Sequence, residues 1–530
     1  MKRLASSVLL GALSALFLSS PLSAQGVTRI SVDAFGVEGN AASTRSSISA
    51  DGQILAYQSS ASNLVAGDTN SQSDIFVLDR ATGIPIRVSV DSFGVEANGL
   101  SEYPDIAQGG QFVAFSSHAT NLVPNDTNSA SDIFVHDLST GVTTRVSVDS
   151  SGIEGNGDSI RCSISSDGRY VVYESEAVNL VASDTNGVGD IFLHDRQTAV
   201  TTMVSVDSIG VQGNGLCQRP AISANGLVIA FMSASTNLVS GDTNSRTDIF
   251  VHEHLGGQTT RVSVKSGGNE SSGRCNDPEL SSDGMVVVFT SDAFNIAPGN
   301  RNSGQDDVYI HDRATASTSR VSVNSQGVAG VQWSRNGALS ADGRYVVFES
   351  WSNDLITQDF NLMTDVFLHD RALGRTKNLS YSMVTVQGNR GSASPVISAD
   401  GDVILFDNFA ANLVMNDTNG VDDIFINDRS AYPNFSKSGT CPGPVRMQIS
   451  NLTSGGRVAL LYGTHGIFVQ TGQPCNGLQL GILAPNVGAI FTADALGEVS
   501  FTLNSLSAQC WSSMQAVDLT SCKASNRLIL

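Results

Sequence analysis

The sequence DTNSQSDIFVLD, from Asp68 to Asp79, decides the fold because related stretches return along the chain at a fixed step. The aspartate that opens each DIF-type segment stands at positions 74, 132, 190, 248, 307, 365 and 423, so successive copies are 58 or 59 residues apart. A second marker, S-x-D-G or a variant of it, keeps the same step from Asp51 to Asp400. The body of the chain is therefore seven copies of one unit.

Each unit divides into four short strand-like segments joined by turns. In the first unit these segments are 46–49, 53–59, 74–79 and 85–90. Four strands in a unit of this length are typical of a propeller blade. The second and third segments are apolar on both faces, which is expected where each sheet lies between two others. One aromatic residue in each third segment is predicted to pack between blades: Phe76, Phe134, Phe192, Phe250, Tyr309, Phe367 and Phe425.

The two ends of the repeat region predict that the ring closes. The stretch V-T-R-I-S-V (27–32) matches a fourth segment with no first three before it, and the seventh unit ends at 428 without a fourth segment. If residues 27–33 complete the last blade, the ring has no open edge to aggregate. We therefore predict an all-β protein with a closed seven-bladed propeller.

The repeat S-x-D-G-R-Y-V-V-F…D-I-F-V-H-D-R…T-R-V-S resembles the TolB-type (WD-like) propeller repeat of exported bacterial proteins, over residues 27–429. The resemblance implies the propeller fold. It leaves the activity open, because the family includes periplasmic interaction proteins, propellers fused to peptidases and some polysaccharide lyases. This chain departs from the family pattern in the long connection that carries the DTN element.

The remaining segments are assigned by composition. Residues 1–24 have the basic start, apolar stretch and small-residue end of a secretory signal, so we expect a periplasmic or extracellular protein. Residues 25–429 form the propeller, 430–437 a linker and 438–530 a small β-sandwich with short apolar runs. The sandwich resembles a C-terminal module of secreted bacterial proteins. No later segment is apolar and long enough to span a bilayer.

Four of the seven cysteines lie in this C-terminal module, where an oxidising compartment favours disulfides. The pairs Cys441–Cys475 and Cys510–Cys522 are our prediction. Cys217 and Cys275 occupy equivalent positions in adjacent units, so the alternatives are a bridge between them, which leaves Cys162 free, or three buried thiols.

The formal net charge is −20, and it becomes −22 once Lys2 and Arg3 leave with the signal. Such a chain repels nucleic acid and anionic lipid and attracts cations or basic partners.

The DTN loops carry oxygen ligands at the first, third and seventh positions, which suits calcium. The glycine and the final glutamate of an EF-hand loop are missing, so Asx turns are the alternative. The candidate ligands are Asp68, Asn70, Asp74, Asp126, Asn128, Asp132, Asp184, Asn186, Asp190, Asp242, Asn244, Asp248, Asp417, Asn419 and Asp423.

The sequence contains no nucleophile elbow, zinc-binding helix or phosphate-binding loop, and its five repeated histidines (136, 194, 252, 311 and 369) lie on different blades. We therefore predict a non-enzymatic scaffold. The two long connections of each blade emerge on one face, and their acids and amides make it the expected binding face for a protein or glycan: Glu38, Asn40, Glu96, Asn98, Glu154, Asn156, Gln212 and Asn214. The alternative is a carbohydrate-active enzyme, a lyase or glycosidase, for which Trp333 and Arg335 are the best blade-specific candidates.

Overall fold

The structure, a computed structural model, describes residues 27–429 except 303, 358 and 382–386, and beyond them the strands of the C-terminal part. Residues Gly26–Ala431 form one compact unit, and residues Tyr432–Leu530 belong to a second. In the described part of the chain, no helix is long and apolar enough to cross a membrane.

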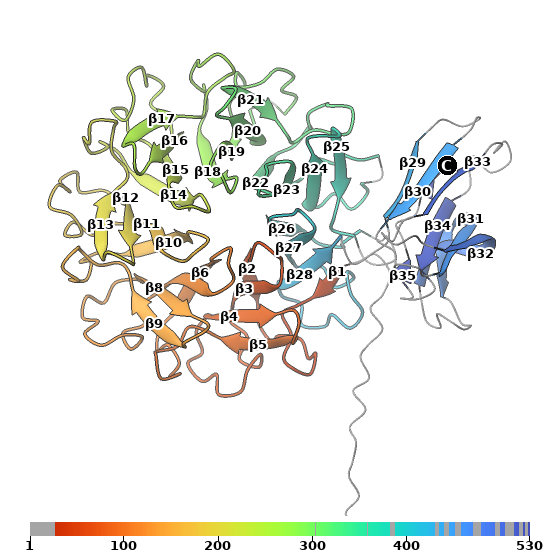
Figure 1. Cartoon of the computed structure of the whole chain (residues 1–530), viewed down its shortest axis with the longest axis horizontal. Coiled ribbons are helices and arrows are strands. Elements are labelled where there is room, and N and C mark those ends of the chain that lie inside the picture. The colour runs from red at the N-terminus through yellow and green to blue at the C-terminus, as the bar shows by residue number, and fades with distance from the viewer. Residues whose placement is uncertain are drawn as a thin grey trace, which may run out of the picture. The chain divides into compact units, whose positions relative to one another are not determined.

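The first unit is a ring of seven four-stranded antiparallel sheets, which confirms the predicted seven-bladed propeller (Figure 1). The innermost strands are β2 (Ser43–Ile48), β6 (Ser101–Ile106), β10 (Ser159–Ile164), β14 (Cys217–Ile222), β18 (Cys275–Leu280), β22 (Ser334–Leu339) and β26 (Ser392–Ile397). The second strands are β3 (Ile54–Ser59), β7 (Phe112–Ser117), β11 (Tyr170–Ser175), β15 (Val228–Ser233), β19 (Val286–Ser291), β23 (Tyr345–Ser350) and β27 (Val403–Asn408).

The third strands carry the DIF-type segments: β4 (Asp74–Asp79), β8 (Asp132–Asp137), β12 (Asp190–Asp195), β16 (Asp248–Glu253), β20 (Asp307–Asp312), β24 (Asp365–Asp370) and β28 (Asp423–Asp428). The outer strands of blades 1–6 are β5 (Ile84–Arg87), β9 (Val142–Arg145), β13 (Val200–Met203), β17 (Gln258–Arg261), β21 (Ser317–Arg320) and β25 (Arg375–Asn378). The innermost strand of the first blade is longer than the predicted 46–49, and its outer strand is shorter than the predicted 85–90.

The seventh blade closes the ring with the start of the chain, as predicted. Strand β1 (Val27–Arg29) pairs antiparallel with β28, and its register places Val27 opposite Asn427. The backbone N–H of Ile30 extends the pairing by donating to the Ile424 carbonyl at 2.9 Å. The residues at the two ends of the propeller are thereby joined in one sheet.

The core lies between blades, because both faces of each sheet are covered. In β4, Ile75, Phe76 and Val77 are all buried. Each predicted aromatic has a cross-strand partner on the second strand of its blade; the rings of Phe76 and Tyr57 lie 5.9 Å apart. Phe76 also belongs to a cluster that includes Leu405 and Ile424 of the seventh blade, which confirms the predicted inter-blade packing.

The S-x-D-G turns hold the blades together at the face opposite the long connections. Asp51 accepts hydrogen bonds from the Ser49 hydroxyl at 2.6 Å and from the Gln53 N–H at 3.0 Å. Gly52 has a φ of +68°, and a Cβ there would lie 2.7 Å from a methyl carbon of Val403 in the neighbouring blade. Only glycine therefore permits both the turn and this close approach.

The repeated histidines also join blades. The hydroxyl of Thr143 in β9 donates to the Val90 carbonyl of the preceding blade at 2.6 Å, so its oxygen accepts from His136 Nδ1 at 2.9 Å. The same arrangement holds His194, His252, His311 and His369. These buried histidines are structural, as their spread over five blades indicated.

Cys162, Cys217 and Cys275 are free, so the alternative of a bridge between Cys217 and Cys275 is wrong. Each of these two thiols packs against a serine hydroxyl of its own blade, 3.1 Å away at Ser233 and 3.3 Å away at Ser291. The four C-terminal cysteines lie outside the described residues.

The C-terminal part contains two antiparallel sheets. One consists of β29 (Asn434–Ser438), β30 (Val445–Ser450) and β33 (Val499–Leu503). The other consists of β31 (Arg457–Val469), β32 (Gln479–Thr492), β34 (Ser513–Asp518), β35 (Lys523–Ala524) and β36 (Leu528–Ile529). This all-β composition agrees with the predicted fold class.

Candidate functional site

The DTN loops form Asx turns. In the first blade, Asn70 Oδ1 accepts a hydrogen bond from the Gln72 N–H at 2.8 Å, and Asn70 Nδ2 donates to Asp74 Oδ2 at 3.0 Å. The asparagine therefore turns a donor, and not an oxygen ligand, toward the aspartate. Equivalent turns are made by Asn128, Asn186, Asn244 and Asn419 among the predicted ligands, and by Asn361 in blade 6.

An arginine that sequence reasoning missed lies among the carboxylates of these loops. In the first blade, Arg87 Nη1 is 3.5 Å from Asp68 Oδ1, 3.4 Å from Asp74 Oδ2 and 2.8 Å from Glu96 Oε2. Arg145 occupies the same place beside Asp126 and Asp132, Arg261 beside Asp242 and Asp248, and Arg29 beside Asp417 and Asp423. The acids of the long-loop face thus serve the scaffold in these four blades.

Blades 3 and 6 replace the arginine and its glutamate together. In blade 3, Met203 stands at the arginine position and Gln212 at the glutamate position. Gln212 Nε2 donates to Asp184 Oδ1 at 2.9 Å and to Asp190 Oδ2 at 2.8 Å. One neutral amide therefore substitutes for an Arg–Glu pair, so the charge of the loop is the same either way.

The pKa values of the loop carboxylates depend on burial, on their carboxylate neighbours and on the arginine beside them. Burial and the neighbouring Asp132 raise the pKa of Asp126 to about 6, although Arg145 opposes the shift. Oxygens of Asp126, Asp132 and Glu154 lie within 4.8 Å of one another, a spacing that suits a cation. A calcium ion at this place would have to displace the guanidinium, and calcium binding at the DTN loops stays a prediction.

A different group of residues surrounds the channel at the centre of the ring. Each innermost strand has a β-bulge, and in each bulge one residue that is not glycine has a φ of 49–53°. The seven residues are Arg45, Tyr103, Arg161, Arg219, Asp277, Asn336 and Ser394. This left-handed conformation costs about 1 kcal/mol or more at each position.

Side chains of the second strands stabilise several of these bulges. Asp407 Oδ2 accepts from the Arg45 N–H at 3.2 Å, and Glu174 Oε2 accepts from the Arg219 N–H at 2.8 Å. In each case the acceptor belongs to the preceding blade of the ring. The strained residue is therefore held by its neighbour, and its side chain is left to point into the channel.

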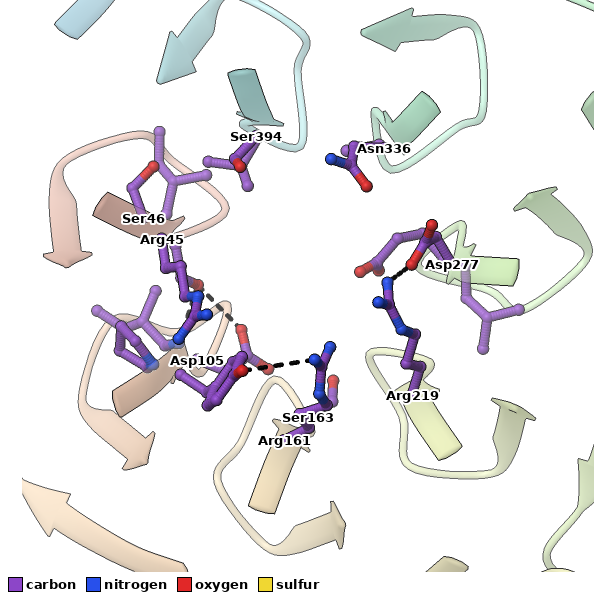
Figure 2. A pocket seen from close by; sticks show the side chains of 18 of the residues that line it. Arg45, Ser46, Asp105, Arg161, Ser163, Arg219, Asp277, Asn336 and Ser394 are labelled. Carbon is purple, nitrogen blue, oxygen red and sulfur yellow. Dashed lines mark hydrogen bonds and ion pairs between the residues drawn. The ribbon is translucent and has the colours of Figure 1, made fainter. Parts of the chain in front are cut away.

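These residues line a cavity of about 560 Å³, which we call the vestibule (Figure 2). They follow the start of each innermost strand, where the long connections arrive, so the vestibule lies toward the long-loop face. Toward the other face, Ser282 Oγ donates to Gln108 Oε1 across the channel at 3.2 Å. Backbone hydrogen bonds between neighbouring S-x-D-G turns surround this end, such as Ala399 N–H to the Ala50 carbonyl at 3.0 Å.

Arginines and acids both line the vestibule. The guanidinium carbons of Arg45 and Arg161 lie 3.9 Å and 4.8 Å from the centre of the Tyr103 ring. Arg219 forms an ion pair with Asp277 (Figure 2). Glu279 is exposed to the channel, and the surrounding protein, with the charge of Asp105, raises its pKa to about 8.

The two blade-specific residues noted in the sequence lie at the entry to this region. Trp333 directly precedes β22, three residues before Asn336 of the vestibule. The Trp333 ring packs edge-on against Trp351 with the centroids 6.2 Å apart. Arg335 places its guanidinium carbon 4.9 Å from the Trp333 ring and binds Asp306 at 2.5 Å. Sequence reasoning found this pair but missed the seven bulge residues.

The chain is only distantly similar to known proteins. No family model matches the sequence, and no curated protein matches it. Among solved structures, a candidate TolB from Agrobacterium tumefaciens is 16% identical, with 65% of this chain and 93% of that chain covered and a TM-score of 0.34. The Dos1 propeller is 10% identical, with coverages of 76% and 95% and a TM-score of 0.40. A prolyl endopeptidase is 11% identical, with coverages of 84% and 59% and a TM-score of 0.46. At these identities and TM-scores the likeness carries no argument about fold or function.

Proposed function

We propose that this protein is a non-enzymatic binding scaffold that holds a protein or glycan partner on its long-loop face, with the vestibule as the anchoring site. The observation that carries the proposal is the set of seven bulge residues. The repeat makes these positions equivalent, yet they carry arginine, tyrosine, aspartate, asparagine and serine. A scaffold role would favour one residue type, as the inter-blade histidines and aromatics illustrate.

The rigidity of the ring supports binding at this place. Blades are joined by packed aromatics, by the Thr–His bonds and by the turn-to-turn bonds at the closed end of the channel. Side chains on such a framework are held in position before a ligand arrives, which reduces the entropy lost on binding. Binding sites are commonly built in this way, from variable side chains on a fixed scaffold.

We propose further that the chain is an exported member of the TolB-type repeat family. The signal-like residues 1–24 and the repeat pattern support this part of the proposal. Exposure to a periplasmic or extracellular medium would bring the long-loop face into contact with envelope proteins and glycans.

To test this proposal, the full-length mature protein is immobilised, and the partners that it retains from the exported fraction are measured. We expect the double variant R219Q/D277N, which removes both charges of one vestibule pair and so leaves no charge unmatched, to lose retention at least tenfold. The matched control is Q53A in the turn between β2 and β3 on the opposite face, where Gln53 is exposed. Equal retention by R219Q/D277N and the parent protein would place the binding site elsewhere.

A carbohydrate-active enzyme is the second candidate, and Glu279 favours it. A carboxyl group whose pKa is raised to about 8 in a cavity suits a general acid, and Asp105 lies close enough to influence it. Incubation with a panel of polysaccharides tests this candidate. Cleavage that E279Q abolishes would replace the binding-only proposal.

A further inference from the structure

Trp333 and Trp351, which we call the rim pair, are an aromatic pair at the long-loop ends of β22 and β23 in blade 6, and the scaffold does not require them. Trp351 is 49% exposed, and its indole Nε1 donates to the Leu362 carbonyl at 3.0 Å. Trp333 lies against it, half-buried. Blade 1 has Ala42 and Ser60 at the same two positions. The pair is therefore an addition made in one blade, on the strand that leads to Asn336.

The charges of the vestibule exclude a strongly anionic ligand. Arg45 is paired with Glu102 at 3.0 Å, Arg161 lies 3.6 Å from Glu174, and Arg219 is paired with Asp277. Because each guanidinium has a carboxylate beside it, and Asp105 and Glu279 add two further acids to the cavity wall, no excess of positive charge remains to attract an anion. An apolar ligand is excluded as well, because burying these groups without hydrogen bonds is costly.

The same residues suit a ligand that carries many hydroxyl groups. Each arginine has five N–H donors, and among the described contacts Arg45 uses only Nη1. Carboxylate and amide oxygens beside them accept hydrogen bonds, so neighbouring hydroxyls find donors and acceptors together. Aromatic rings add a flat apolar surface on which the C–H face of a sugar ring can pack.

We propose that the vestibule and the Trp333–Trp351 pair together bind a neutral oligosaccharide. One sugar ring packs on the exposed face of Trp351, and the following units enter the vestibule past Asn336. The three residues from Trp333 to Asn336 span about 10 Å of extended chain, so a short oligosaccharide reaches both places. This inference rests on the proposed function of the long-loop face and names the chemical class of its ligand.

The test uses a panel of neutral oligosaccharides of four to six units, from cello-, xylo-, manno-, malto- and chito-series, with the full-length mature protein. Binding is measured by calorimetry and by tryptophan fluorescence, because the chain has three tryptophans and the third, Trp511, lies in the other unit. The variant W333A/W351S gives blade 6 the residues that blade 1 carries. W511F is the matched control.

We expect at least one series to bind with a change in fluorescence that W511F retains and W333A/W351S loses. R219Q/D277N should weaken the same binding at least tenfold. No binding by any series would overturn the inference, and so would binding that both rim and vestibule variants leave unchanged. A third outcome is that the retention experiment captures a protein that covers the exposed Phe360 and Leu362, while no oligosaccharide binds. This outcome would also overturn the inference, but it would leave the proposed function standing.

Discussion

Replacing Arg87 by methionine would remove the guanidinium that lies among Asp68, Asp74 and Glu96. The site is largely withdrawn from water: the side chains of Arg87 and Asp68 are 10% and 3% exposed, and that of Asp74 is fully buried. Removal of one partner from a buried ion pair leaves the other charge without compensation and costs about 3–5 kcal/mol. We expect R87M to lose about 3–4 kcal/mol at pH 7, the part of this range that lies below the limit set by protonation of a carboxyl group.

Protonation of a carboxyl group sets an upper limit to that loss. Holding one aspartic acid in its neutral form at pH 7, about three units above its ordinary pKa, costs about 4 kcal/mol. Burial already raises the pKa of Asp68 and Asp74, and the loss of Arg87 would raise both further. A raised carboxyl pKa means that the folded state keeps a proton that the unfolded state releases, so the loss shrinks as the pH falls toward 5.

The chain supplies its own control for this variant. The double variant R87M/E96Q copies Met203 and Gln212 of blade 3, where the glutamine amide bonds both aspartates. We expect it to recover most of the loss of R87M, because the charge balance and the hydrogen bonds return together. E96Q alone leaves Arg87 in place and tests whether the glutamate matters by itself.

The assay is thermal and urea unfolding of the propeller at pH 7 and pH 5. For a unit of about 400 residues, a loss of about 4 kcal/mol lowers the midpoint by about 5 °C. An R87M midpoint equal to that of the parent would refute the role of the guanidinium. If R87M/E96Q were as unstable as R87M, the equivalence of the two loop types would be refuted instead.

Three further predictions concern the ring, its histidines and the DTN loops. Deleting residues 27–33 exposes the edge of β28, so we expect lower solubility and a lower midpoint by calorimetry; unfolding like the parent would make β1 a free tail. Burial lowers the pKa of His194 to about 4, so the stability contributed by its neutral form is lost as the pH falls from about 6.5 to 4. H194N, which copies Asn427 of blade 7, should reduce this pH dependence in urea titrations, and an unchanged dependence would contradict it. Calcium binding predicts that about 10 mM calcium raises the midpoint, that a chelator lowers it and that D68N/D74N removes one increment; no shift would leave the loops as turns.

The fold could be predicted from the sequence because its determinants repeat. The DIF-type strand and the S-x-D-G turn recur seven times, and the unpaired stretch 27–32 at one end matches the strand missing at the other. Each of these features acts between adjacent segments or adjacent blades. Their consequences for pairing follow directly from strand periodicity and from the need to cover an edge.

The DTN loops show where the same reasoning failed. The pattern from Asp68 to Asp74 presents oxygen atoms, but the groups that face them come from elsewhere in the unit. Arg87 lies 13 residues after Asp74, and Glu96 follows nine residues later. Comparison of the seven copies would have found the arginine, because it stands in five blades, four of which also have the glutamate, and the two blades without arginine have glutamine in place of the glutamate.

The vestibule was missed for the opposite reason. Its residues differ in type from blade to blade, and a search for repeats looks for residue types that recur. Position 45 and its equivalents hold Arg, Tyr, Arg, Arg, Asp, Asn and Ser, which looks like the variation of a loop. The structure places all seven on strands, at bulges with a left-handed residue, and in four of them a side chain of the neighbouring blade accepts a hydrogen bond from the N–H of that residue. Elsewhere in the ring, a side chain must satisfy its neighbour in the next blade, and repetition of that contact keeps the residue type constant. Where this bond is made, the bulge residue contacts its neighbour through the backbone N–H, so its side chain is free to vary. A binding site on a closed ring requires side chains that can vary at positions where the backbone is fixed. This is the reason why we propose the channel as the site of binding.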